Sequence, residues 1–133
     1  MTKLFLDANV LVSAAYSDSG RLVELWSFPD ELCSSPYAVE EAHRNLRLPE
    51  RHARLDRLLT AMSIASGLAP LPAGIVLVEK DRPILQAAIY ASATHLLTGD
   101  KRHFRHLDGQ RVEGVLIQRP GDYLRLRRPP KSS

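Results

Sequence analysis

Residues 81–104 read DRPILQAAIYASATHLLTGDKRHF, and they contain the clearest structural signals in the chain. Pro83 suits the first turn of a helix, and the small and apolar residues after it have the spacing of a helix face that packs against a core. Residues 95–98 form a short apolar run, typical of a buried strand, which leads through Gly99 to Asp100. The segment therefore predicts a helix, then a strand, then an acidic residue at the carboxyl end of that strand.

The same alternation of strands and helices extends through the rest of the chain. Short apolar runs predict further strands at residues 3–6, 32–34, 115–118 and, as an additional candidate, 75–78. Helical spacing and capping residues predict helices that start at Asn9 as N-cap, cover residues 22–26, run from Pro36 to before Pro49, cover residues 50–65, and run from Pro120 through Leu126. This order predicts an α/β fold with three layers (α/β/α) and a mainly parallel central sheet.

The length and composition indicate one soluble globular domain. A chain of 133 residues with 44% hydrophobic and 25% charged residues has material for one core, which we place in residues 1–128, with a disordered tail at 129–133. No apolar run is long enough to span a bilayer, and Asp7 interrupts the first apolar stretch too early for a secretory signal, so we expect a cytoplasmic protein. Cys33 is the single cysteine, which excludes an internal disulfide and a thiolate metal site.

The positive charge is unevenly distributed. The formal net charge is only +3, but arginine and lysine gather in two segments, either of which could face nucleic acid or simply water. The first group is Arg44, Arg47, Arg51, Arg54 and Arg57, and the second is Arg125, Arg127, Arg128 and Lys131.

Four acidic residues stand at positions where a parallel α/β fold binds ligands. Such folds bind at the carboxyl ends of the strands. Asp7 directly follows the first predicted strand, and Asp100 follows the strand at residues 95–98 after one glycine. Asp81 lies at a helix N-terminus, and Glu41 lies in the first turns of the helix after Pro36. Carboxylates gathered in one cleft repel each other and lose hydration, so they take up protons or bind cations.

The chemistry of such a cleft favours a hard divalent cation and a phosphate ester. Oxygen ligands suit Mg²⁺ or Mn²⁺, which also bind phosphate oxygens. Each acid taken alone has an ordinary interpretation, because an aspartate after a strand is often a cap or turn residue. Glu40 also competes with Glu41 for the position in the cleft. The functional interpretation therefore depends on the combination.

In combination, the acidic motifs resemble those of the PIN domain nucleases, a family that includes the toxins of bacterial VapBC-type toxin–antitoxin pairs. The resemblance covers nearly the whole chain. It is carried by a first strand ending in an acid, a glutamate on a helix, two acids around a helix and strand, and a final strand, proline and helix. These segments read FLDANVLVSA, SSPYAVEEAHRNL, DRPILQAAIYASATHLLTGDKRHF and GVLIQRPGDYL.

The resemblance implies a role for each matching residue. The catalytic acids and ligands of one or two Mg²⁺ or Mn²⁺ ions would be Asp7, Glu41, Asp81 and Asp100. The polar residues that orient these acids would be Asn9, Thr98 and Ser13. The residues proposed to hold the phosphates of the substrate are Lys101, Arg102 and Arg44. At His103 the chain departs from the pattern, because many members have another aspartate near that position; we expect a surface histidine there, with substrate contact as the alternative.

The implied activity is a metal-dependent endoribonuclease that cleaves single-stranded RNA, acting as the toxin of a toxin–antitoxin pair. Family toxins pair with a small antitoxin and commonly form homodimers. A non-catalytic PIN-like module that binds RNA or protein is the main alternative. A haloacid-dehalogenase-type phosphatase is disfavoured because Asn9 stands where its second aspartate would be, and a response-regulator receiver because the chain lacks an early acidic pair after a strand.

Overall fold

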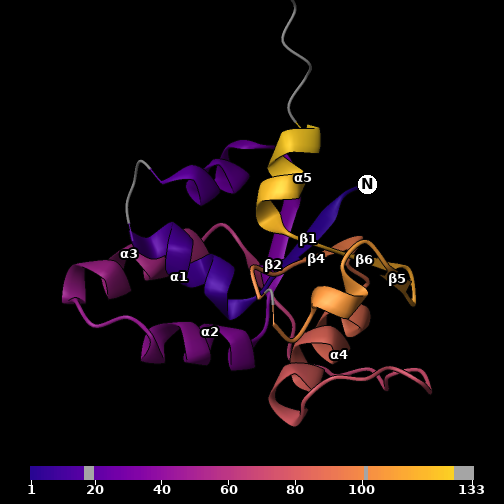
Figure 1. Ribbon diagram of the computed structural model, residues 1–133. Helices are drawn as coiled ribbons and strands as arrows, with labels where there is room; N and C mark the ends of the chain where they lie inside the picture. Colours follow the sequence, from indigo (N-terminus) through magenta and orange to yellow (C-terminus); the bar gives the residue numbers. More distant parts are fainter. Residues whose placement is uncertain (17–19, 101, 128–133) are drawn as a thin grey trace, which may run out of the picture.

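The computed structural model describes residues 1–16, 20–100 and 102–127. Six strands form one sheet in the order β3-β2-β1-β4-β6-β5, and all neighbours are parallel except the antiparallel pair β5 and β6 (Figure 1). The strands are β1 (Lys3–Leu6), β2 (Glu31–Ser34), β3 (Ser63–Ile64), β4 (His95–Leu97), β5 (Arg111–Val112) and β6 (Val115–Gln118). The predicted α/β fold with a mainly parallel sheet is confirmed.

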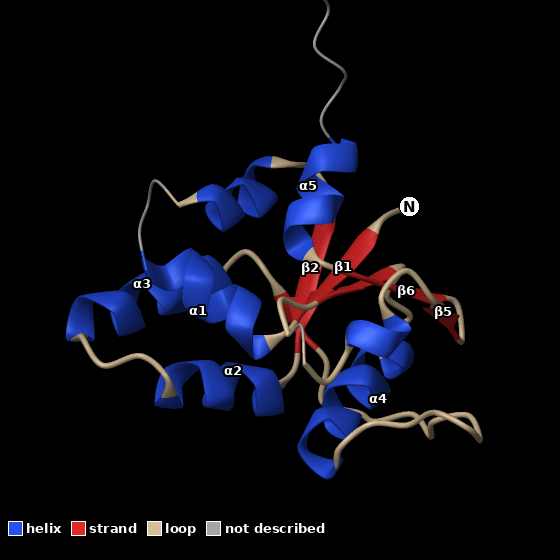
Figure 2. Cartoon of the chain, in the orientation of Figure 1, coloured by secondary structure: helices blue, strands red, loops and turns tan. Residues whose placement is uncertain are grey.

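Helices cover both faces of this sheet. Figure 2 shows α1, α2 and α3 on one side and α4 on the other, and α1 packs against both α2 and α3. The α-helices are α1 (Ala8–Tyr16), α2 (Pro36–Arg44), α3 (Pro49–Leu59), α4 (Arg82–Tyr90) and α5 (Pro120–Arg127), and the 3₁₀ helices are η1 (Arg21–Ser27), η2 (Glu79–Asp81) and η3 (Arg105–Leu107). Among the described residues, no helix has both the length and the apolar character needed to cross a membrane.

The central strands form the core and fix the position of the cleft. Leu4, Phe5 and Leu6 of β1 are fully buried, as expected for a strand with helices over both faces. Leu6 of β1 is in register with Leu97 of β4, so the chain leaves both strands at the same edge of the sheet. Cys33 of β2 is buried in this core as a free thiol.

Several helices and strands differ from those that the local sequence patterns predicted. The helix predicted over residues 50–65 ends at Leu59, and Ser63–Ile64 instead form β3 beside β2. Pro49 begins this helix, whereas the helix before it already ends at Arg44. Residues 75–78 are not a strand: Ile75 and Leu77 pack on the core while Val76 and Val78 are exposed, so an unpaired segment produces the same alternation. The tail predicted at residues 129–133 lies outside the described residues.

The arginine-rich segment on α3 has partly structural contacts. Arg54 donates from Nη1 to the carbonyl oxygens of Ala15 and Tyr16, at 2.9 and 3.0 Å, and the guanidinium of Arg51 lies 4.0 Å from the centre of the Tyr16 ring. Cations at the last carbonyls of a helix are favourable because they oppose its negative end. Two of the arginines expected to face nucleic acid or water thus hold α3 against the end of α1.

Candidate metal centre and active-site cleft

A cleft of about 390 Å³ opens at the carboxyl edge of the sheet, and all four predicted acids line it. The acids come from four different elements, since Asp7 follows β1, Glu41 lies on α2, Asp81 precedes α4, and Asp100 follows β4. The full lining is Asp7, Ala8, Asn9, Val12, Ser13, Glu41, Asn45, Lys80, Asp81 and Asp100. The fold therefore brings together side chains that are up to 93 positions apart, between Asp7 and Asp100.

Asp7 is held at the floor of the cleft by two hydrogen bonds. Asp7 is only 5% exposed. One carboxylate oxygen accepts the backbone N–H of Ala8 at 2.6 Å, and the other accepts the hydroxyl of Thr98 at 2.8 Å. Burial raises the pKa of Asp7 to about 6 despite these hydrogen bonds, and the charges of Glu41 and Asp81 raise it further.

Asn9 ties the end of β4 to α1. The sequence suggested Asn9 as the N-cap of the first helix, but this is wrong, because α1 already begins at Ala8. The side-chain oxygen of Asn9 instead accepts the backbone N–H of Gly99 at 2.8 Å, and its amide lies 3.5 Å from the Thr98 hydroxyl. A β-carbon at Gly99 would lie 3.3 Å from the Asn9 oxygen, so glycine allows this close approach.

Thr98 connects two acids, whereas Ser13 does not. The Thr98 hydroxyl donates to Asp7 and accepts the backbone N–H of Asp100 at 3.1 Å. Thr98 is buried, so its hydroxyl is restricted to this bridging position. Ser13 lines the cleft, but no hydrogen bond joins it to any of the four acids within the described residues.

Asp81 lies where η2 meets α4, at the predicted helix N-terminus. Its side chain makes no capping hydrogen bond to that helix. Burial raises the pKa of Asp81, because the residue is 8% exposed. The turn is anchored from the other side of the cleft, since the hydroxyl of Tyr37 on α2 donates to the carbonyl oxygen of Lys80 at 2.7 Å.

Asp100 organises the loop that follows it. One of its carboxylate oxygens accepts the backbone N–H groups of Arg102 and His103, both at 2.9 Å. Burial by itself would raise the pKa of Asp100, but these two hydrogen bonds, together with the nearby charges of His103 and Lys80, lower the pKa below its usual value. Asp100 is therefore ionised more readily than its neighbours Asp7 and Asp81.

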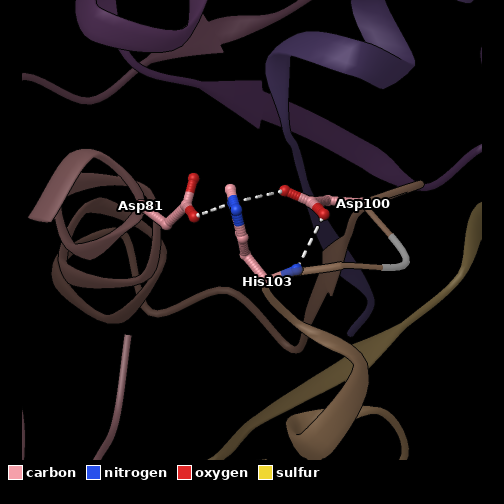
Figure 3. A group of neighbouring side chains, drawn as sticks. All are labelled: Asp81, Asp100 and His103. Carbon is pink, nitrogen blue, oxygen red and sulfur yellow. Dashed lines mark hydrogen bonds and ion pairs between the residues drawn. The ribbon is translucent and has the colours of Figure 1, made fainter. Parts of the chain in front are cut away.

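His103 contacts two acids of the cleft and its side chain is 22% exposed, so the expected surface histidine is wrong. Its Nδ1 is 2.6 Å from Oδ2 of Asp81 and 3.2 Å from Oδ2 of Asp100 (Figure 3). The loop turns back because of its two hydrogen bonds to Asp100, and the next residue, Phe104, is 1% exposed and anchors it in the core. The apolar residue after His103 was the sequence signal for this inward turn.

The structure separates Glu41 from its rival. Glu41 lines the cleft and is half-buried, whereas Glu40 is exposed and pairs with Arg44 at 3.5 Å. Arg44 and Arg102 are exposed and do not line the cleft, and Lys101 lies outside the described residues. Lys80 and Asn45, which were not predicted, do line it. The sequence offered little indication that these two residues line the cleft, because Lys80 is distinguished only by preceding Asp81 and Asn45 is the C-cap residue of α2.

The donor atoms present suit a divalent cation. One ligand atom each from Asp81, Asp100 and His103 lies within 4.8 Å of the others, which combines two carboxylates with an imidazole. Oδ2 of Asp81 and Nδ1 of His103 are buried and have no hydrogen-bond partner among the described residues. Carboxylate and imidazole donors with unsatisfied buried atoms fit a bound metal ion.

One chain of the VapBC2 complex from Rickettsia felis, in a crystal structure bound to a DNA fragment from their promoter, matches this protein with a TM-score of 0.61. The match covers 89% of this chain and 98% of that chain, at 16% sequence identity. The two chains share a fold. No protein-family model and no curated protein matches the sequence.

Proposed function

We propose that this protein is a metal-dependent endoribonuclease that cleaves single-stranded RNA, with a VapC-like role as the toxin of a toxin–antitoxin pair. The observation that carries this proposal is the convergence of Asp7, Glu41, Asp81 and Asp100 on one cleft at the carboxyl edge of the sheet. The fold shared with a chain of the VapBC2 complex supports the same conclusion. The four acids of the motifs that resemble those of PIN domain nucleases all line this cleft.

The acids are proposed to hold one or two Mg²⁺ or Mn²⁺ ions. When bound, such an ion lowers the pKa of a coordinated water and neutralises charge on the phosphodiester as its bond breaks. Asp81 and Asp100 would hold it directly, with Asp7 and Glu41 as further acids of the same cleft. Thr98 would keep Asp7 and Asp100 in fixed relative positions through its two hydrogen bonds.

Basic and polar groups at the rim are proposed to position the RNA. Lys80 is a cationic residue of the cleft lining and can bind a backbone phosphate. Arg102, Lys101 and Arg44 remain proposed phosphate contacts outside the lining. Such contacts are blind to sequence, and they suit single strands, whose bases can splay away from the backbone.

The biological setting belongs to the same proposal. We assign the protein to the cytoplasm, where its RNA substrate would be found, and expect a small antitoxin protein to cover the acidic cleft. A homodimer is the proposed form of the toxin. Co-expression with the product of a small neighbouring gene, followed by size-exclusion chromatography with light scattering, tests both associations.

The decisive experiment is a cleavage assay with purified protein, single-stranded RNA and Mn²⁺ or Mg²⁺. We expect EDTA and the variant Asp7→Asn with Asp100→Asn to abolish cleavage. Glu41→Gln and Glu40→Gln form a matched pair on adjacent positions, because the first removes a charge from the cleft and the second removes one from the solvent-exposed face. Only Glu41→Gln should reduce the rate.

The opposite outcomes are equally specific. Equal cleavage by the Asp7 and Asp100 double variant would assign the activity to a contaminant or to other residues. RNA binding that persists without cleavage under every metal condition would favour the non-catalytic PIN-like module instead.

A further inference from the structure

His103 places a nitrogen donor between two carboxylates that come from different parts of the chain. Asp81 lies before α4 and Asp100 after β4, and the histidine side chain fills the space between them (Figure 3). The side chains of His103, Asp81 and Asp100 are 22%, 11% and 21% exposed. The three groups are thus largely withdrawn from water.

The facing atoms of His103 and Asp81 are in contact with each other but have no assigned hydrogen bond among the described residues. Nδ1 of His103 makes ion-pair contacts with Oδ2 of Asp81 at 2.6 Å and with Oδ2 of Asp100 at 3.2 Å. Neither Nδ1 of His103 nor Oδ2 of Asp81 has an assigned hydrogen bond in the described part of the chain, and both atoms are buried. A buried polar atom without a hydrogen bond destabilises the fold. A cation beside both atoms would satisfy them together.

The spacing of the donors suits one ion. Ligand bonds of about 2.1 Å in an octahedral site place adjacent ligand atoms about 3 Å apart. Nδ1 of His103 lies 3.2 Å from Oδ2 of Asp100 and 2.6 Å from Oδ2 of Asp81, on either side of that value. The ligand atoms of Asp81 and Asp100 lie within 4.8 Å of each other, so all three donors border one small volume.

We propose that His103 is a nitrogen ligand of the metal site, together with Asp81 and Asp100, and that it makes the site prefer first-row transition ions over Mg²⁺. Imidazole binds transition ions well, whereas Mg²⁺ keeps its water and favours oxygen ligands. This inference rests on the proposed function, because it assumes that the acidic cleft holds a metal, and it adds the identity of one ligand and the resulting selectivity.

Pulsed electron paramagnetic resonance of the whole protein with Mn²⁺ tests the ligand directly. A coordinated histidine nitrogen modulates the electron spin echo, and ¹⁵N-histidine labelling changes the frequency of that modulation. We expect the nitrogen signal in the natural protein, its loss in His103→Gln, and its retention in the control His106→Gln. His106 is an exposed histidine three positions later whose Nε2 contacts the carbonyl oxygen of Val76 at 2.6 Å.

Calorimetric titration with each ion tests the selectivity. His103→Gln should weaken Mn²⁺ binding by about tenfold or more while Mg²⁺ binding changes much less. Circular dichroism checks that this variant is folded, and the nitrogen signal of the natural protein needs no variant at all.

The outcomes separate this inference from the proposed function. Bound Mn²⁺ without a nitrogen signal, or equal affinities in His103→Gln, would reduce His103 to an internal ion-pair partner, even if RNA is cleaved. A nitrogen signal without any cleavage would support the ligand assignment and overturn the nuclease. Failure of Mn²⁺ to bind at all would overturn both.

Discussion

Asp30 and Asp81 both have largely buried side chains, but their carboxylates have opposite surroundings. Asp30 lies just before β2, at the amino edge of the sheet, and its side chain is 8% exposed. It accepts the hydroxyl of Tyr123 at 2.7 Å and Nε of Arg127 at 3.3 Å. Asp81 lies at the carboxyl edge, and its Oδ2 has no hydrogen-bond partner in the described part of the chain.

The difference separates a structural carboxylate from a candidate ligand. A buried carboxylate with a phenol and a guanidinium as partners connects α5 to the sheet and has little capacity left for a ligand. A buried carboxylate whose neighbours are other acids and one imidazole still needs positive charge. Burial alone would have ranked the two residues equally, so the partners, rather than the exposed area, identify the site.

The largest expected effect is on cleavage. Asp81→Asn should lower the rate of RNA cleavage by at least about a hundredfold, because Asp81 is a proposed metal ligand and its loss would remove several kcal/mol of transition-state stabilisation. Asp30→Asn should leave the rate nearly unchanged. Single-turnover cleavage kinetics of the two variants measure this contrast, and comparable losses in both would remove the distinction between the two edges.

The next effect concerns stability and pH at Asp7. Folding raises the pKa of Asp7 from 3.8 to about 6, so the folded protein favours the neutral carboxyl group. The stabilisation from this protonated Asp7 is therefore fully present below pH 3.8 and is lost as the pH rises through about 6. Asp7→Asn should therefore stabilise the metal-free protein by up to about 3 kcal/mol at pH 8 and by almost nothing near pH 4. Urea unfolding in EDTA at both pH values checks this. A gain that is equal at both pH values would assign it to something other than the buried charge.

A smaller change is expected at the amino edge. Tyr123→Phe removes the phenol that donates to Asp30, so the free energy of unfolding should fall by about 1–3 kcal/mol while metal affinity stays the same. Thermal unfolding together with Mn²⁺ titration separates the two properties. A weaker metal affinity in this variant would mean that the two edges are coupled.

The smallest effect tests how the cleft is braced. Tyr37→Phe removes the hydrogen bond to the carbonyl oxygen of Lys80 that anchors the turn before Asp81. Stability should fall by only about 0.5–1.5 kcal/mol. Cleavage should slow by several-fold, because Asp81 would be less well positioned. An unchanged cleavage rate would show that α4 alone positions Asp81.

Much of the fold could be predicted, because it is encoded locally. The strands at residues 3–6 and 115–118 are apolar runs, so their own composition already predicts them, and tertiary contacts add only their pairing with neighbouring strands. The two-residue strands β3 and β5 could not be predicted, since their pairing comes from a neighbouring strand rather than from their own composition. The pattern at Ile75 and Leu77 failed for the related reason that alternation reports burial, not hydrogen bonding.

For the site, the amino-acid sequence was enough to locate Asp7, Glu41, Asp81 and Asp100 at the ends of strands and starts of helices, because those positions follow from local periodicity and from the geometry of parallel sheets. Only the tertiary structure put His103 between two of these acids and supplied Asp30 with its partners. These outcomes depend on how loops fold back and on which helix face is covered, and both are set by contacts between residues far apart in the chain.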